Sequence, residues 1–234
     1  MSGPVRFFSG QVTLDGPSGT GKSSVARAVA ARLGAAYLDT GAMYRAATVA
    51  VLDAGVDPED ADAVAAVVAA ARIEVGTTAG AEVVRVDGVD VVDRIRSAEV
   101  TRAVSPVSAV PAVRRQLVAQ QRALVEAADA VVVEGRDIGT VVLPEATLKV
   151  YLIADPEVRA QRRAGQLGLT TPAEVAELAE DLRRRDEYDS GREDSPLRPA
   201  PDAVIVDSTH LDRAQVIDRV VALAATAVGA GERT

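Results

Sequence analysis

The stretch "QVTLDGPSGTGKSS" (Gln11 to Ser24) decides the fold of this chain. It opens with a short apolar run typical of a buried strand, continues through a glycine-rich turn, and then enters a helical pattern. Val25, Val29 and Leu33 repeat on one face of that helix, and Gly34 is placed to end it. A strand, a glycine-rich turn and a helix in this order predict one unit of an α/β fold.

The turn itself, "GPSGTGKS" (Gly16 to Ser23), fits the phosphate-loop pattern G-x-x-x-x-G-K-[ST]. Its glycines let backbone N–H groups curl around phosphates, and the following helix N-terminus adds a favourable dipole. We expect Lys22 to reach the β- and γ-phosphates of a nucleotide and the Ser23 hydroxyl to ligate Mg²⁺. An ordinary glycine turn is the competing interpretation, but Lys22 and Lys149 are the only lysines of the chain. The predicted ATP-binding residues are Gly16, Pro17, Ser18, Gly19, Thr20, Gly21, Lys22, Ser23 and Ser24.

Length and composition exclude several classes of protein. The chain has 234 residues, enough for one sizeable core with a small insertion. It has no cysteine and a single histidine, which excludes disulfides, thiolate metal sites and multi-histidine metal clusters. The formal charge of -8 argues against a nucleic-acid partner. No apolar run reaches the ~20 residues that a bilayer requires, and "MSGPVRFFSG" lacks the apolar stretch of a secretory signal. We expect a cytoplasmic protein without a membrane partner.

The rest of the chain repeats the alternation of strand and helix. Strands are expected at 35–38, 130–135, 148–154 and 203–209, and helices at 39–55, 58–72, 110–128, 155–167, 172–186 and 212–228. This alternation predicts a three-layer α/β fold with a central parallel sheet covered on both faces. Residues 73–92 alternate and are rich in valine and glycine, like a small antiparallel sheet. We therefore expect a single domain over 1–234 with an insertion at about 67–104.

Charged residues gather where the predicted strands turn into helices. "YLDTGAMYR" begins as a strand and becomes helical, so that Tyr44 and Arg45 fall one turn inside the helix, near the sheet edge where such folds bind ligands. "VVVEGRDIGT" places Arg136 and Asp137 directly after another buried strand. An arginine at such an edge can hold a phosphate through two parallel hydrogen bonds. Taken alone, each of these residues is more often a solvated surface charge.

Further charged and polar residues follow the same tendency. Ser105 lies in what reads as a helix-breaking segment, and Arg114 falls in the first turns of the next helix. The other candidates are Arg185, Asp189 and Arg192 in "RRRDEYDSGR", and Arg159, Arg162 and Arg163, whose i, i+3, i+4 spacing puts three positive charges on one helix face. So many arginines at these junctions indicate a site for two phosphoryl groups and their transition state. The phosphate loop alone leaves a GTPase, a motor or transport ATPase and a small-molecule kinase open, and the absence of N-K-x-D weighs against the GTPase.

Several segments together resemble the bacterial cytidylate kinase family, which belongs to the nucleoside monophosphate kinases with a phosphate loop. The resemblance runs over nearly the whole chain, through "DGPSGTGKSS", "LDTGAMYR", "SPVSAVPAVRRQL", "VVEGRDIGTVV", "RRDEYDSGR" and "DAVIVDST". The family carries an enlarged monophosphate-binding insertion, which fits the region 67–104, and a lid that closes over the phosphates, which fits 155–192. It implies transfer of the γ-phosphoryl group of ATP to CMP or dCMP, with Mg²⁺, in a monomeric enzyme.

The resemblance also implies a role for each candidate residue. Arg45 and Arg136 are expected to grip the phosphate of CMP, while Ser105, Arg114 and Asp137 read the cytosine. Arg185 and Asp189 are expected to hold the sugar hydroxyls. The full CMP-binding set is Thr40, Gly41, Tyr44, Arg45, Ser105, Arg114, Arg136, Asp137, Arg185, Asp189 and Arg192, and the catalytic set is Lys22, Arg136, Arg162 and Arg163. Arg159 and Arg192 are expected in or beside the lid.

Two other functions stay open from the residues. The first is the same kinase with another acceptor such as UMP, although a uracil reader needs a donor where Asp137 offers an acceptor. The second is a phosphate-loop regulatory or assembly protein that binds ATP without a small acceptor, which leaves the arginine clusters without a purpose. The segment between Arg162 and Arg185 is short beside the family, so the extent of the lid is open as well.

Overall fold

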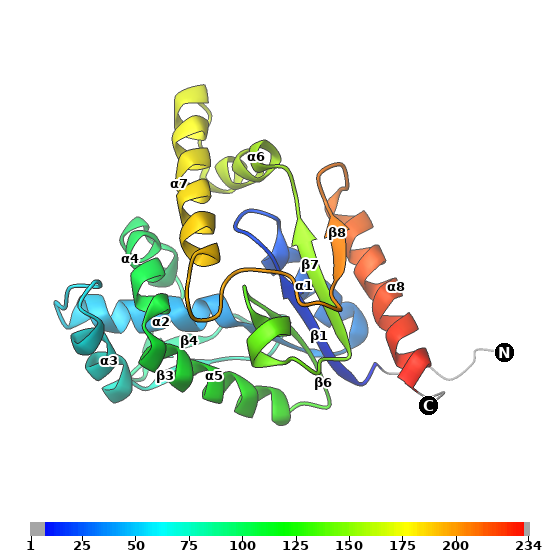
Figure 1. Cartoon of the computed structure of the whole chain (residues 1–234), viewed down its shortest axis with the longest axis horizontal. Coiled ribbons are helices and arrows are strands. Elements are labelled where there is room, and N and C mark those ends of the chain that lie inside the picture. The colour runs from blue at the N-terminus through cyan, green and yellow to red at the C-terminus, as the bar shows by residue number, and fades with distance from the viewer. Residues whose placement is uncertain (1–7, 232–234) are drawn as a thin grey trace.

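The computed structural model describes residues 8–231 (Figure 1). Residues 1–7 and 232–234 lie outside the described residues. Most of the N-terminal stretch in which we expect no secretory signal therefore falls outside them. Five strands form a parallel sheet in the order β2-β6-β1-β7-β8. They are β1 (Gly10–Asp15), β2 (Ala36–Asp39), β6 (Ala130–Glu134), β7 (Leu148–Ile153) and β8 (Val204–Asp207). The parallel sheet predicted from the sequence is confirmed.

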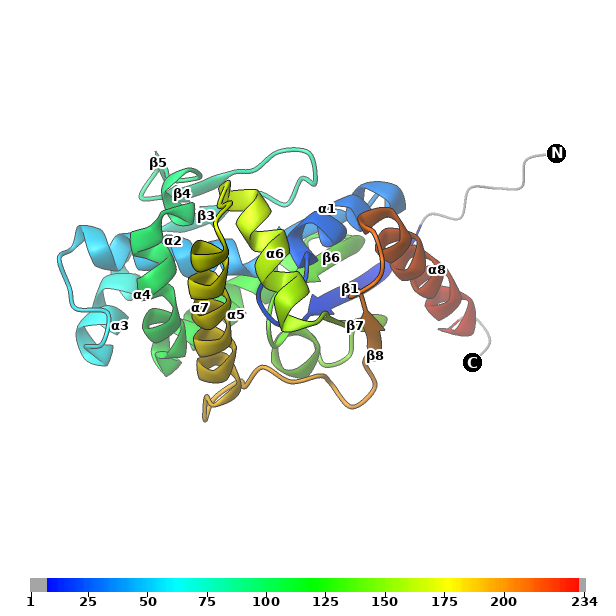
Figure 2. The ribbon, with the colours of Figure 1, turned by 90° about the horizontal axis from the view of Figure 1, so that it is seen from above.

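Helices cover both faces of this sheet, each over its own apolar core (Figure 2). On one face, α1 (Lys22–Leu33) and α8 (Arg213–Gly231) bury side chains such as Val29 against β1 and β7. On the other face, α2 (Thr40–Asp53) and α5 (Pro111–Glu126) pack with Leu117 fully buried. Strand β6 carries apolar side chains on both sides, with Val131 and Val133 in one core and Val132 in the other, so it needs both layers to be buried.

A smaller unit lies between α2 and α5 in the chain. It holds α3 (Ala61–Ala70), the short strands β3 (Ile73–Val75), β4 (Val84–Val86) and β5 (Val89–Asp90), the 3₁₀ turn η1 (Arg94–Arg96) and α4 (Ala98–Ala109). The three strands pair antiparallel in sequence order, as predicted. Their buried side chains join the core of α2 and α5, so this unit is packed onto the main fold. The insertion bounds at 67 and 104 fall inside α3 and α4, and the insertion as a subdomain stays a prediction.

Two local expectations are wrong. Pro58 does not start a helix, because α3 begins three residues later, at Ala61, where the Asp60 side chain accepts a hydrogen bond from the Ala63 N–H (3.1 Å). The reason is that an aspartate cap satisfies a free helix-end N–H, which a proline cannot do.

The second wrong expectation is the helix break around Ser105. Helix α4 continues through Pro106 to Ala109. A proline inside a helix removes one backbone hydrogen bond and its ring crowds the carbonyl four residues earlier, so Pro106 by itself disfavours α4. The buried side chains of Val104 and Val107, before and after the proline, hold both parts of α4 on the core.

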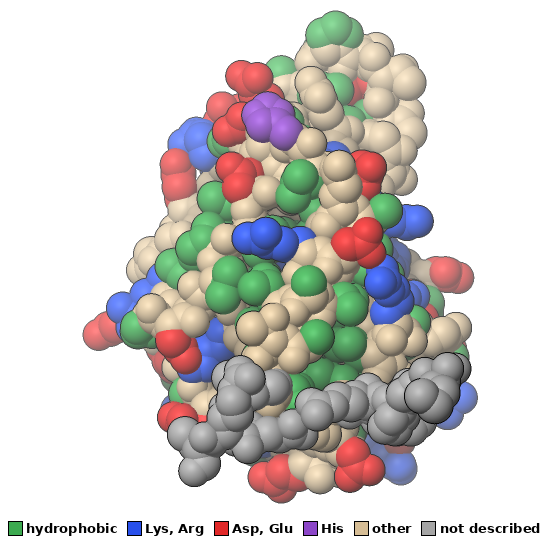
Figure 3. Space-filling view, turned by 90° about the vertical axis from the view of Figure 1, so that its right-hand side faces the viewer, with side chains coloured by type: hydrophobic (Ala, Val, Ile, Leu, Met, Phe, Trp, Pro, Cys, Tyr) green, Lys and Arg blue, Asp and Glu red, His purple; other side chains and the backbone are tan. Residues whose placement is uncertain are grey.

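Helices α6 (Pro156–Leu167) and α7 (Pro172–Ser190) stand beyond the carboxyl ends of β1 and β7 (Figure 1). A capping box between Thr171 and Glu174 begins α7. The two helices fill most of the predicted lid region, 155–192, and its action as a lid stays a prediction. None of the helices described in residues 8–231 is long and apolar enough to cross a bilayer. His210, to which no role is assigned, is exposed on the side shown in Figure 3.

Candidate active site

The predicted site residues lie at the carboxyl edge of the parallel sheet, where four segments meet. The phosphate loop follows β1, the first turn of α2 follows β2, Gly135 to Asp137 follow β6, and α6 follows β7. The chain after β6 makes a π-helical turn, η2 (Ile138–Val142). Asp15 fastens this turn, since its two carboxylate oxygens accept the backbone N–H groups of Ile138 (2.9 Å) and Gly139 (2.8 Å).

The phosphate loop has the backbone that its glycines predict. Gly16 has a φ of 143°, and a Cβ there would lie 2.1 Å from the carbonyl oxygen of Leu152, so no side chain fits. Gly21 has a φ of 91° and caps α1. The Lys22 Nζ donates to the Pro17 carbonyl at 2.6 Å, which folds the lysine over its own loop. Burial and the nearby Arg136 lower the pKa of the Lys22 ammonium.

Ser23, the predicted metal ligand, lies beside a buried carboxylate. The Ser23 Oγ donates to Glu134 Oε2 at 2.9 Å, and the Tyr37 hydroxyl donates to the other oxygen of Glu134. Burial raises the pKa of Glu134 to about 7, with a further contribution from Asp39. The Glu134 carboxylate therefore lies on the phosphate-loop serine, beside the predicted metal position.

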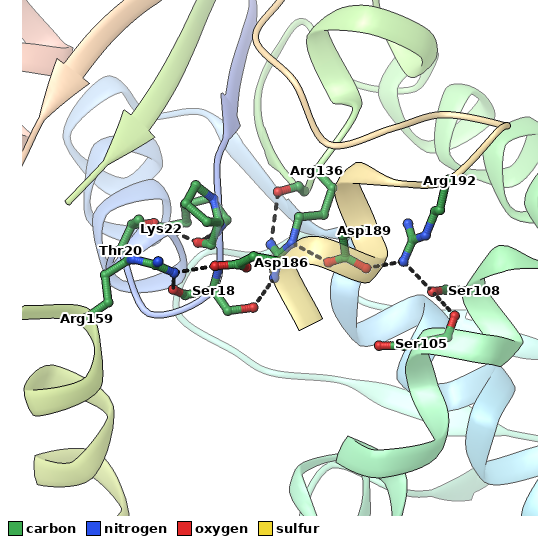
Figure 4. A network of polar contacts seen from close by, with 12 residues as sticks. Ser18, Thr20, Lys22, Ser105, Ser108, Arg136, Arg159, Asp186, Asp189 and Arg192 are labelled. Atoms are coloured by element: carbon green, nitrogen blue, oxygen red, sulfur yellow. Dashed lines mark hydrogen bonds and ion pairs between the residues drawn. The ribbon is translucent and has the colours of Figure 1, made fainter. Parts of the chain in front are cut away.

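Arg136 and Asp137, neighbours in sequence, serve different parts of the site. Arg136 Nη2 donates to Ser18 Oγ in the phosphate loop at 2.7 Å, and its Nε donates to Asp189 Oδ2 at 3.2 Å (Figure 4). Asp137 instead forms an ion pair with Arg114, and both side chains are nearly inaccessible to solvent. Arg136 therefore contacts the phosphate loop, whereas Asp137 belongs to a separate cluster of buried side chains around Arg114.

The cluster around Arg114 is formed by side chains of α2, α4 and α5. Arg114 donates to the Ser108 carbonyl at 3.2 Å, and its guanidinium stacks over the Tyr44 ring at 5.3 Å from the ring centre. The Tyr44 hydroxyl and the Arg114 Nε are buried without a hydrogen-bond partner. Buried polar atoms are rarely left unpaired, so this cluster has hydrogen-bonding capacity that the protein itself does not use.

The end of α7 and the residues that follow it contact the same cluster. Arg192 pairs with Asp189 and donates to Ser108 Oγ at 2.9 Å, while Ser108 Oγ donates to the Ser105 carbonyl at 3.0 Å (Figure 4). The structure thus brings together five predicted residues, Ser105, Arg114, Asp137, Asp189 and Arg192. Ser108 was missed, although it stands one helical turn after Ser105.

Four guanidinium groups from different segments, those of Arg45, Arg136, Arg163 and Arg185, lie near one another beside the phosphate loop. Arg45 donates to the Ile95 carbonyl (2.9 Å) and to Thr101 Oγ1 (3.0 Å), and burial together with Arg163 lowers its pKa to about 10. Burial, Arg136 and Arg45 lower the pKa of Arg185 to about 9. Partly buried cations that lie close together are costly unless an anion joins them. This corner of the molecule is therefore suited to a phosphate.

Other predicted residues have a different position. The Thr40 hydroxyl donates to the Glu134 carbonyl at 2.7 Å, which ties α2 to β6, and Gly41 follows in the same turn. Arg162 donates to the Ser208 carbonyl at 2.7 Å and to the Leu211 carbonyl at 3.2 Å, after β8. Arg163 donates to Gln166 at 3.0 Å. Arg162 and Arg163 therefore point to different partners, while Arg159 on the same helix donates to the Ser18 carbonyl. The roles given to Arg162 and Arg163 stay predictions.

Asp186 was missed by the sequence analysis and is central to the site. Its Oδ1 accepts the backbone N–H of Ser18 at 3.0 Å, and its Oδ2 pairs with Arg159. Asp186 precedes Asp189 by three residues on α7, so both carboxylates lie on one helix face. That spacing was the signal that the sequence offered.

Comparisons with known proteins agree with this geometry. The family model described as "Cytidylate kinase" matches residues 12–226. "Cytidylate kinase" of Rhodococcus opacus (strain B4) is 53% identical over 222 residues, which cover 94% of this chain and 97% of that protein. "Cytidylate kinase" of Nocardia farcinica (strain IFM 10152) is 52% identical over 221 residues, covering 94% and 95%.

Among solved structures, a gluconokinase from Sinorhizobium meliloti 1021 superposes with a TM-score of 0.53 at 18% identity, and the match covers 98% of this chain and 99% of that one. At this identity the likeness concerns the fold alone. The family match over most of the chain and the curated relatives at more than half identity are independent of it. On these matches, the chain belongs to the cytidylate kinase family.

Proposed function

We propose that this protein transfers the γ-phosphoryl group of ATP to CMP or dCMP, which yields ADP and CDP or dCDP. The observation that carries the proposal is the convergence of Arg45, Arg136 and Arg185 at a corner that adjoins the phosphate loop. Arg136 contacts Ser18 in that loop and Asp189 on α7, so its guanidinium would lie between the two bound nucleotides. The names of the relatives support CMP as the acceptor.

The cluster around Arg114 and Asp137 would hold the cytosine. The base offers an amino group, which suits a carboxylate, and two acceptors, which suit an arginine and a serine. Arg45 and Arg136 would hold the acceptor phosphate, and Asp189 with Arg185 the sugar. Tyr44, whose hydroxyl is buried without a partner, would line the cytosine site.

The transfer would rest on positioning and on charge stabilisation, as is usual for phosphoryl transfer. Lys22 and Arg136 would stabilise the negative charge on the transferred group, with Arg162 and Arg163 brought in by closure of the lid region 155–192. No general base is required because the acceptor phosphate is already an anion.

The residues at the phosphate loop fit Mg²⁺. Ser23 Oγ and the carboxylate of Glu134, 2.9 Å apart, are hard oxygen donors of the kind that this ion prefers. Ser23 would ligate it, and Glu134 would hold the serine or a bound water in place. Mg²⁺ held there would neutralise part of the negative charge that develops on the phosphate oxygens during transfer. We further propose a monomer that acts in the cytoplasm, with 67–104 as the monophosphate-binding insertion.

A coupled assay of ADP release, with ATP and Mg²⁺, tests the proposal across CMP, dCMP, UMP, AMP and GMP. We expect strong turnover with CMP and dCMP and weak turnover with UMP. Lys22→Ala, which removes a charge that the γ-phosphate needs, should lower turnover by about 10²-fold or more. Equal use of UMP would retain the kinase but contradict cytosine reading by Asp137, and no turnover with any acceptor would favour a regulatory ATP-binding protein.

A further inference from the structure

Asp186 binds two groups, the Ser18 N–H and the Arg159 guanidinium, that are also suited to the phosphates of a nucleoside triphosphate. Its Oδ1 accepts the Ser18 N–H of the phosphate loop at 3.0 Å, and its Oδ2 pairs with Arg159, whose Nη1 also donates to the Ser18 carbonyl at 2.9 Å (Figure 4). Backbone N–H groups of such a loop and nearby arginines are the natural partners of phosphate oxygens. In this structure the Asp186 carboxylate, which is also an anion with two oxygens, binds these groups instead of a phosphate.

The contact is well enclosed, which makes it energetically significant. The Arg159 side chain is 10% exposed and that of Asp186 is 16% exposed. Helix α6 packs directly on the loop at this point, because a Cβ on Gly19 would lie 3.0 Å from both the Cβ and the carbonyl oxygen of Arg159. Charge-assisted hydrogen bonds with little access to water are stronger than those on an open surface.

We propose that Asp186 is an internal competitor of the donor phosphates, which holds Ser18 and Arg159 until ATP displaces it. This inference rests on the proposed binding of ATP at the phosphate loop. When ATP binds, the Asp186 carboxylate must leave the Ser18 amide, and Arg159 exchanges a carboxylate for phosphate oxygens. The cost of that exchange lowers the affinity for ATP, and it links donor binding to the position of α7, which also carries Asp189.

The test is ATP binding without an acceptor, measured by calorimetry on Asp186→Asn. Asparagine has nearly the same shape but no charge, so we expect it to bind ATP about tenfold more tightly than the unaltered chain. The gain should grow from AMP to ADP to ATP and vanish with adenosine, which has no phosphates. In steady state, KM for ATP should fall while KM for CMP changes less than twofold.

Two further variants separate competition from structure. Asp186→Glu keeps the negative charge and should bind ATP with an affinity within about threefold of the unaltered chain. Glu187→Gln removes the neighbouring carboxylate, which pairs with Arg183 on the exposed side of α7, and should leave ATP binding unchanged. If the asparagine variant does not fold, Asp186→Ala provides the same loss of charge.

Weaker ATP binding by Asp186→Asn would overturn the proposal and make Asp186 a residue that orients Arg159 for the phosphates. Unchanged binding would overturn it too, because competition requires a gain. These outcomes are distinct from a failure of the proposed function. A chain that fails to phosphorylate CMP but binds ATP more tightly as Asp186→Asn would refute the acceptor and retain the competitor.

Discussion

At the scale of single residues, the site depends on charged side chains that leave neighbouring positions in different directions. Arg136 contacts the phosphate loop and Asp189, whereas Asp137 pairs with Arg114 out of contact with solvent. An ion pair in such a place is stabilising only while both members are present. The choice of substitution therefore decides whether an experiment measures base recognition or folding.

Asp137→Asn should raise KM for CMP at least about tenfold and leave KM for ATP unchanged. Asparagine keeps an acceptor but brings an amide donor to the base, so the use of UMP relative to CMP should rise. Steady-state kinetics with both acceptors measure this. Asp137→Ala is the poorer variant, because it leaves Arg114 buried and unpaired at a cost of about 3–5 kcal/mol.

The matched control is Asp218→Asn. Asp218 is an exposed carboxylate of α8 that pairs with Arg32 of α1, and its substitution should change neither KM for CMP nor KM for ATP. Unaltered CMP kinetics in Asp137→Asn would contradict the assignment of Asp137 to the base.

Asp15 gives a pH dependence of stability. Burial raises its pKa from 3.8 to about 6, against the two backbone hydrogen bonds from Gly139 and Ile138. Between these values the unfolded chain has lost a proton that the folded chain keeps, so the free energy of unfolding falls as pH rises. Each unit by which the pKa is raised costs about 1.4 kcal/mol above that window.

Denaturant titrations of the unaltered chain and of Asp15→Asn, at steps from pH 4 to pH 7, isolate this contribution. The stability of the unaltered chain relative to the variant should fall over that window and level off above it. A difference that stays constant, or that rises with pH, would contradict the raised pKa.

At the scale of elements, α6 and the phosphate loop are fitted to each other through one glycine. Gly19 has a φ of 80°, which suits glycine, and a Cβ there would lie 3.0 Å from the Cβ and the carbonyl oxygen of Arg159, closer than an ordinary contact. Gly168, at the end of α6, has a φ of 70° but nothing within 4 Å of the Cβ position. At both positions a side chain would strain the backbone, and only at Gly19 would it also press against a neighbouring residue.

Gly19→Ala should therefore displace α6 and raise KM for ATP by roughly tenfold or more, with CMP binding little affected. Gly168→Ala should lower stability by about 1 kcal/mol through backbone strain alone and leave KM for ATP unchanged. Kinetics and thermal unfolding of both variants measure the contrast. Equal effects on KM for ATP would show that strain, not contact with Arg159, is responsible.

At the scale of the whole molecule, one sheet separates two apolar cores. Leu117 on α5 is fully buried in one, and Leu152 on β7 is fully buried in the other. Strands β2 and β6 contribute side chains to both cores, so we expect the two cores to unfold together. Leu117→Ala and Leu152→Ala should each lower the free energy of unfolding by about 2–5 kcal/mol.

Both variants should still unfold in a single transition, which circular dichroism and tyrosine fluorescence would follow together in denaturant. Two separate transitions in either variant would mean that the smaller unit around β3 to β5 is a domain with its own stability, and not a part of one folded body.

The sequence by itself determined the alternation of strands and helices except for α4, together with the parallel sheet, the small antiparallel sheet and the phosphate loop. These depend on periodic apolar residues and on glycines, and such signals act over short stretches of chain. It also indicated most residues that meet at the carboxyl edge of the sheet, because loops that follow parallel strands converge there.

Only the tertiary structure decided which partner each charged side chain has. Ser18 and Asp186 are 168 positions apart in the chain, and Ser18 and Arg136 are 118 apart, yet both pairs are hydrogen-bonded. Arginine is long and flexible, so its partner depends on which distant segment the fold brings within reach. For the same reason the common spacing of Arg159, Arg162 and Arg163 predicted a shared helix face, while packing sent the first to the phosphate loop and the second to the turn after β8.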